Sequence, residues 1–99
     1  MEIKILEEGK PTVFAIEGRL DTNTAPQLEE FAGGLFEAGT VDLVVDMSAC
    51  DFVSSAGLRV IVAMQKRVVN SGSLVFKGVQ SDVMDVFEMT GFSKILTFE

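Results

Sequence analysis

The sequence predicts an α/β protein with a single mixed sheet of about five strands and helices packed on that sheet. Segments typical of strands and helices alternate along the chain, in the order β-β-α-β-α-β-α-β. The segment VDLVVDM at residues 41–47 is short and almost wholly apolar, which is typical of a strand covered on both faces at the centre of a sheet. Strand–helix–strand connections predict parallel pairing with right-handed crossovers. A chain of 99 residues supports one core, so residues 1–99 are expected to form a single domain.

The first half of the chain supplies a hairpin and a helix. Residues 1–6 and 11–17 alternate in hydrophobicity around a turn-like Glu-Glu-Gly-Lys, which predicts an N-terminal hairpin. A helix is expected to start at Thr24, a capping residue type, with Pro26 in the first turn and Gln27 three residues after the cap.

The second half of the chain predicts two further helices, each followed by a strand. One helix follows the motif DFVSSAGLRVIVAM at residues 51–64 and extends to about residue 70. Its apolar period predicts a buried stripe formed by Leu58, Ile61, Val62, Gln65 and Val69. Residues 74–77 predict a strand, and Ser81 begins the third helix, with Gly91 as its C′ residue. Residues 95–98 predict the last strand.

The composition excludes several kinds of function. Eight basic and fifteen acidic residues give a formal charge of −7, which disfavours binding to nucleic acid or to anionic membranes. The chain has no histidine and only one cysteine, Cys50, so it lacks the triads and dyads of common hydrolases and any thiolate metal cluster. We therefore expect no enzyme activity, no metal site and no cofactor.

The expected location is the cytoplasm. No apolar run approaches the roughly 20 residues that a membrane span needs. The first residues, MEIKILEEGK, lack the basic and then apolar pattern of a signal peptide. A protein partner is expected, and the protein itself is expected to be a monomer.

The serine pair in the motif lies where ligand-binding loops of open α/β sheets lie, beyond the carboxyl end of a central strand. Residues 51–56 are expected to form this loop and to lead into the N-terminus of a helix. Ser54 fits the N-cap, and Ser55 begins the first turn with its hydroxyl outward. A nucleophilic serine is disfavoured because no base is evident, and a phosphate-cradling loop lacks the required glycines and lysine. Two interpretations remain: both serines only cap the helix, or one of them accepts a phosphate.

The combined pattern resembles a known family. DMSACDFVSSAGLRVIVAMQKR, preceded by GRLDTNTA and followed by a helix ending in MTGF, is similar to the STAS-domain anti-sigma factor antagonists, also called anti-anti-sigma factors. The resemblance implies the STAS fold and a small bacterial switch protein that regulates transcription. It implies two partners: an anti-sigma factor serine kinase with an ATP-binding fold, bound by the unphosphorylated form, and a metal-dependent serine phosphatase. The kinase would phosphorylate one serine and break the complex, and the phosphatase would restore it.

The resemblance assigns roles to individual residues. The family's acceptor lies two residues before the glycine of a Gly-Leu pair, so Gly57 and Leu58 imply Ser55 as the phosphorylation site, with Ser54 as the alternative. Asp21 matches the family's acidic loop position near the kinase contact surface, and the alternative is that it is only an exposed turn aspartate. The implied partner-binding residues are Asp21, Thr22, Asn23, Val53, Ser54, Ser55, Ala56, Gly57, Leu58 and Arg59.

Other roles follow from the residues nearby. Asp46 and Ser48 are expected to hold the preceding loop by side-chain to backbone hydrogen bonds. Arg59 is either a partial neutraliser of the phosphate or a solvated helix charge. Two alternative functions stay open: a STAS scaffold that binds its partner constitutively, and a small hydrolase or nucleotide-processing enzyme.

Overall fold

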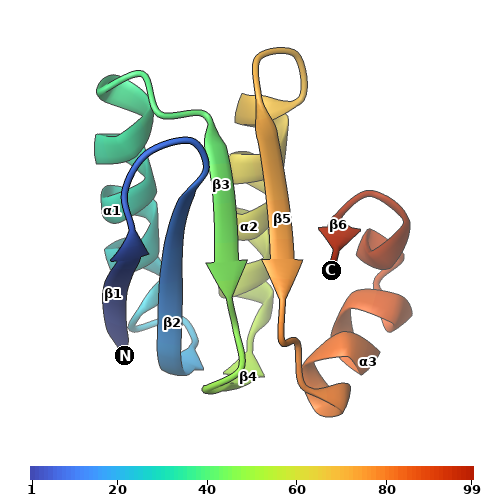
Figure 1. Ribbon diagram of the computed structural model, residues 1–99. Coiled ribbons are helices and arrows are strands. Elements are labelled where there is room, and N and C mark those ends of the chain that lie inside the picture. Colours follow the sequence, from blue (N-terminus) through green and yellow to red (C-terminus); the bar gives the residue numbers. More distant parts are fainter.

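The computed structural model describes residues 1–99 and confirms a mixed α/β fold with an N-terminal antiparallel hairpin. Its elements are β1 (Glu2–Glu7), β2 (Thr12–Leu20), α1 (Ala25–Glu37), β3 (Asp42–Asp46), β4 (Cys50–Val53), α2 (Ser55–Val68), β5 (Ser73–Lys77), α3 (Ser81–Met89), the short 3₁₀ helix η1 (Phe92–Lys94) and β6 (Thr97–Phe98). The expected hairpin, three helices and central strand are all present (Figure 1).

The sheet has the order β1-β2-β3-β5-β6, and β4 pairs with β2 beyond the end of β3. Apart from the antiparallel hairpin, every neighbouring pair of strands is parallel. Strand β2 is long enough to pair twice, first with β3 through Thr12–Ala15 and then with β4 through Gly18–Leu20. The sequence prediction placed residues 51–56 in a loop, so β4 is a correction to it. Strand β4 forms because β2 extends past β3 and offers it a partner. The residues of β4 themselves show no hydrophobic pattern that would predict a strand.

The helices cover one face of the sheet. Figure 1 shows α1 and α2 behind the strands and no helix in front of them. Along β3, Leu43 and Val45 point to the covered face and are buried, whereas Val44 points to the open face and is only partly buried. The prediction that this strand is covered on both faces is therefore wrong. Its apolar open face instead forms a stripe in which Val44 lies between Val13 and Val75.

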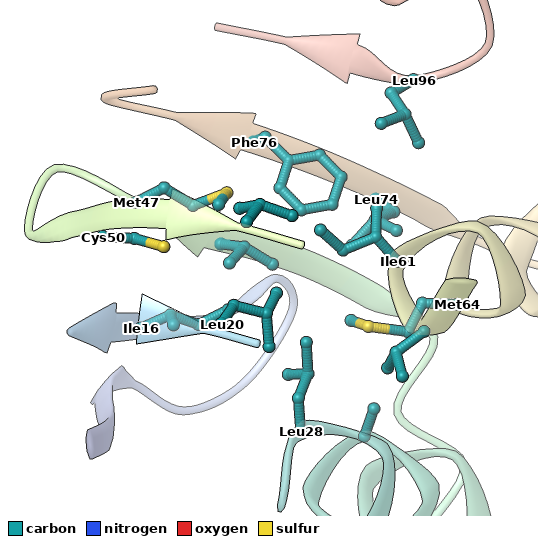
Figure 2. Close-up of a cluster of buried hydrophobic side chains, with 14 of the residues drawn as sticks. Ile16, Leu20, Leu28, Met47, Cys50, Ile61, Met64, Leu74, Phe76 and Leu96 are labelled. Carbon is teal, nitrogen blue, oxygen red and sulfur yellow. The ribbon is translucent and has the colours of Figure 1, made fainter. Parts of the chain in front are cut away.

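The core lies between the covered face and the helices. Figure 2 shows Leu20 of β2 and Phe76 of β5 facing α1 and α2 across this layer. The buried side of α2 is formed by Gly57, Leu58, Val60, Ile61, Met64 and Val68. Of the predicted stripe, Leu58 and Ile61 are buried, but Val69 is 61% exposed because the helix has ended and Val69 is its C-cap. In the first turn of this helix, Gly57 lies in close contact with Leu20 of β2.

The end of α3 follows its prediction. Thr90 is the C-cap, and Gly91 adopts the left-handed conformation with φ of 81°. Glycine reaches this region without steric cost, which explains its position after the helix. The chain then turns through η1 into β6, where Phe98 packs on Phe87 of α3 with 5.6 Å between ring centroids.

Candidate functional site

Two connecting segments lie side by side at the carboxyl ends of β2 and β4. The β2–β4 pairing places Arg19 opposite Phe52 and Leu20 opposite Val53. The backbone N–H of Ser54 then donates to the carbonyl oxygen of Leu20 at 2.9 Å. The segment that enters α1 and the segment that enters α2 are thus held together at their start.

A close approach between Gly57 and Leu20 fixes this arrangement. A Cβ atom at Gly57 would lie 2.7 Å from Cγ of Leu20 and 2.9 Å from its carbonyl oxygen. Only glycine therefore lets the first turn of α2 pack directly on β2. Val53, Gly57 and Leu58, which were expected among the partner-binding residues, are all buried at this junction. Val53 and Gly57 support the surface from beneath, and Leu58 reaches it only at the floor of the groove described below.

The two serines have different environments. Ser54 is the N-cap of α2, as predicted: its hydroxyl oxygen accepts from the N–H of Gly57 at 3.3 Å, and its carbonyl oxygen accepts from Leu58 at 2.9 Å. Ser55 is the first residue of the helix and is exposed, and its hydroxyl makes no hydrogen bond within the protein. Ser55 is the free hydroxyl of the pair, while Ser54 has a structural role.

The loop before α1 is capped by Asp21. One carboxylate oxygen of Asp21, Oδ1, accepts from the backbone N–H groups of Asn23 at 3.0 Å and Thr24 at 3.1 Å. Thr24 has helical backbone angles and makes no capping bond, and its hydroxyl donates to the carbonyl of Arg19 at 2.7 Å. Thr24 is thus the N-cap residue of α1, as predicted, but its side chain does not make the expected capping hydrogen bond. Thr22 and Asn23 project from this loop and are exposed.

The environment of Asp21 favours its charged form. Partial burial acts to raise the pKa of Asp21, but the N–H groups of Asn23 and Thr24, the Thr24 hydroxyl and the positive charge of Arg19 together lower this pKa below its ordinary value. Within the loop, the Oδ1 atom of Asp21 accepts hydrogen bonds from backbone N–H groups, and its Oδ2 atom lies near Arg19. Asp21 lies on the segment that the β2–β4 pairing places beside the serine pair, and its role in partner binding stays a prediction.

An Arg19–Phe52 pair lies at the same edge and was not predicted. The guanidinium carbon of Arg19 lies 4.0 Å from the centre of the Phe52 ring, and Arg19 Nε lies 3.7 Å from a carboxylate oxygen of Asp21. Phe52 is 37% exposed. A cation over an aromatic face is worth about 0.5–1 kcal/mol at an exposed site. The pair arises from the β2–β4 register, and so it becomes visible only once that pairing is known.

Asp46 and Ser48 have the structural role that the sequence predicted. Asp46 Oδ1 accepts from the backbone N–H of Ser48 at 2.9 Å, and Gln80 donates its side-chain amide to the Ser48 carbonyl at 2.9 Å. Hydrogen bonds from Ser48 hold the pKa of Asp46 below its ordinary value. These contacts tie the end of β3 to the start of α3.

A groove runs from Ser55 along α2. It has a volume of about 430 Å³ and lies between α2 and the residues that follow α3. Its lining consists of Ser55, Leu58, Arg59, Val62, Ala63, Lys66, Thr90 and Phe92. No acidic side chain lines it, and its titratable side chains are the basic Arg59 and Lys66. The exposed hydroxyl of Ser55 at this groove is accessible to another protein.

Two further observations concern metal sites and membrane-spanning helices. No group of three or more acidic or cysteine side chains is arranged to hold a metal ion. No helix has both the length and the hydropathy for a membrane span, and the longest, α2, has 14 residues.

The fold and the site define a small α/β binding module that presents a serine at the start of a helix. The STAS domain model matches residues 2–99, and the chain belongs to the STAS-domain family of anti-sigma factor antagonists. The proteins of this family are regulatory binding proteins.

Three relatives illustrate the match. A Bordetella bronchiseptica protein described as an anti-sigma factor antagonist, BtrV, is 36% identical over 85 residues, which cover 84% of this chain and 72% of BtrV. The anti-sigma-B factor antagonist of Staphylococcus aureus is 30% identical over 97 residues, covering 97% of this chain and 90% of the relative. The solved structure of Bacillus SpoIIAA in its phosphorylated form superimposes with a TM-score of 0.75 at 13% identity, covering 99% of this chain and 91% of SpoIIAA.

Proposed function

We propose that this protein is the phosphorylation-switched component of a bacterial partner-switching circuit. The unphosphorylated form binds and sequesters an anti-sigma factor that is also a serine kinase. Phosphorylation of Ser55 by that kinase releases it, and a metal-dependent serine phosphatase resets the protein. The contact surface consists of Asp21, Thr22 and Asn23 from one loop with Ser55, Ala56 and Arg59 from the start of α2.

The observation that carries this proposal is the difference between the two serine hydroxyls. Ser55 is exposed and unbonded, so a kinase can reach it and a phosphate there breaks no hydrogen bond of the fold. Ser54 is the N-cap, and modification of its hydroxyl would remove the bond to Gly57. SpoIIAA, which has the same fold, has a solved phosphorylated form, and this supports a switch of the same kind here.

The physical effect of a phosphate at Ser55 falls on binding more than on folding. A phosphoserine carries a charge of about −1.5 to −2 near neutral pH. The positive end of the helix dipole tolerates an anion in the first turn and stabilises it by about 0.3–1 kcal/mol. A partner that covers Ser55 must instead desolvate the charge, and each 1.4 kcal/mol of that cost weakens affinity about tenfold. Release therefore needs no change of conformation.

The experiment combines the purified protein with the anti-sigma factor kinase of its own organism, with ATP and Mg²⁺, and locates the phosphate by intact-mass and fragment mass spectrometry. We expect one phosphate on wild type and on Ser54→Ala, and none on Ser55→Ala. Calorimetry should show that Ser55→Ala keeps the affinity of wild type and that Ser55→Asp weakens it at least 30-fold. Ser54→Asp is the matched charge control.

Two results would contradict the proposal. Phosphate on Ser54 would move the switch to the capping residue. Absence of phosphate together with equal binding by Ser55→Ala and Ser55→Asp would favour a constitutive STAS scaffold, in which both serines only cap the helix.

A further inference from the structure

Helix α2 is a basic element in an acidic protein. It contains Arg59, Lys66 and Arg67 and no acidic residue, although the chain as a whole has a formal charge of −7. The four ion pairs of the structure involve Lys4, Lys10 and Arg19, and none involves α2. Arg67 lies over the ring of Phe36, whereas Arg59 and Lys66 form no ion pair within the protein and are available to an external partner.

Two of these cations line the groove described above. Arg59 and Lys66 are exposed and border a lining that includes the apolar Leu58, Val62 and Phe92. They are seven residues apart, about 10 Å along the helix axis at 1.5 Å per residue. The groove thus combines an apolar floor with two positive charges at a fixed spacing, which is complementary to an amphipathic segment with acidic residues.

We propose that this groove binds an acidic amphipathic segment of the anti-sigma factor partner. Apolar side chains of the segment cover Leu58, Val62 and Phe92, and two carboxylates about 10 Å apart pair with Arg59 and Lys66. On a helix, that distance corresponds to acidic residues seven positions apart. The inference rests on the proposed function, to which it adds the chemistry of the partner segment.

The same groove explains how one phosphate acts along the whole contact. Ser55 lies at one end of the groove, and Arg59 follows it by four residues, the spacing at which side chains on a helix meet. A phosphate on Ser55 would pair with Arg59 and take that cation from the partner's carboxylate. With a phosphate charge of about −2, the formal charge of the groove falls from +2 to near zero. Phosphorylation therefore removes the complementarity that attracts the segment.

The first test measures binding of the purified anti-sigma factor kinase to Arg59→Gln and Lys66→Gln. Arg67→Gln is the matched control, because Arg67 is on the same helix but does not line this groove and lies over the ring of Phe36. We expect each groove variant to weaken binding at least tenfold, to reduce its salt dependence, and to unfold at the same temperature as wild type. The control should change affinity less than twofold.

The second test identifies the segment by carbodiimide cross-linking, which joins a lysine amine directly to a carboxylate. We expect Lys66 to be joined to an aspartate or glutamate in a partner peptide that also carries apolar residues. Lys66→Arg keeps the charge but lacks the amine, so it should bind normally and lose the cross-link. Ser55→Asp should lose the cross-link together with binding.

The outcomes separate this inference from the proposed function. Equal affinities of the two groove variants and the Arg67→Gln control, with Ser55→Asp still released, would overturn the groove and leave the switch intact. So would a Lys66 cross-link to a basic or wholly polar peptide. Failure of the wild-type protein to bind the kinase at all would overturn both.

Discussion

Replacing Gly57 by alanine should destabilise the protein, whereas the same replacement at Gly34 should stabilise it. Both glycines lie in helices, and alanine normally gains about 0.5–1 kcal/mol over glycine in a helix interior. At Gly34 the added Cβ would meet nothing within 4 Å, so this gain should appear in full. At Gly57 the Cβ would lie 2.7 Å from Leu20 Cγ and 2.9 Å from the Leu20 carbonyl oxygen. Over-packing of this kind costs about 1–3 kcal/mol, and after the helix gain of about 0.5–1 kcal/mol is subtracted, Gly57→Ala should be less stable than wild type by about 1 kcal/mol and at most about 2.5 kcal/mol.

The assay is urea and thermal unfolding of the two variants beside wild type. A change of about 1 kcal/mol moves the unfolding temperature of a domain of this size by about 4–8 °C, so the two variants should move in opposite directions by measurable amounts. The Gly57→Ala variant should also bind the partner more weakly, because the Leu20–Gly57 contact joins the two segments of the site. A Gly57→Ala protein as stable as Gly34→Ala would refute the claim that this contact fixes the start of α2.

Three further predictions concern polar groups at helix and strand ends. Ser54→Ala should lower the free energy of unfolding by about 1 kcal/mol through loss of the N-cap, measured by urea unfolding with Ser55→Ala as a near-neutral control. Ser55→Asp should not destabilise the fold and should raise its unfolding temperature slightly at low salt, an effect that added salt should remove. The lowered pKa of Asp46 means that its stabilisation is present above the unfolded pKa of about 3.8 and is lost as the pH falls through the lower folded value. Asp46→Asn should therefore lose less stability than wild type between about pH 6 and pH 3, and equal losses would contradict the assigned hydrogen bonds with Ser48.

The elements with a strong local signal were predictable, and those that depend on distant pairing were not. Alternating hydrophobicity identified the hairpin, and Gly91 identified the end of α3. Strand β4 has only four residues, and it pairs because β2 extends past β3. Thr24 holds the predicted N-cap position of α1, but its hydroxyl donates to the Arg19 carbonyl, and the carboxylate that accepts from nearby backbone N–H groups is that of Asp21 in the preceding turn. Only the folded structure shows which side-chain oxygen accepts hydrogen bonds from the backbone N–H groups at the start of α1.

The face of α2 was hard to predict for a different reason. Residues 60–64 read Val-Ile-Val-Ala-Met, so an apolar stripe can be drawn on several faces of this helix. The face that is buried carries Gly57, which fits closely against Leu20, together with Leu58, Ile61 and Met64. The serine pair was found because its signal is local. The groove beside it was not, because Thr90 and Phe92 come from a part of the chain that reaches α2 only through the crossover after β5.

The proposed switch would act through charge and not through a change of shape. The start of α2 is held by the Ser54 cap, by its backbone bond to Leu20 and by the close contact at Gly57. None of these contacts involves the Ser55 hydroxyl. A phosphate on Ser55 would therefore break none of them, and the helix would be expected to keep its position. A phosphate on Ser55 would instead change the electrostatic field along the groove, where Arg59 and Lys66 form no ion pair within the protein. Partner affinity should then depend strongly on ionic strength while the stability of the fold does not, since exposed charges are screened over about 10 Å at 0.1 M salt and a packed core is not.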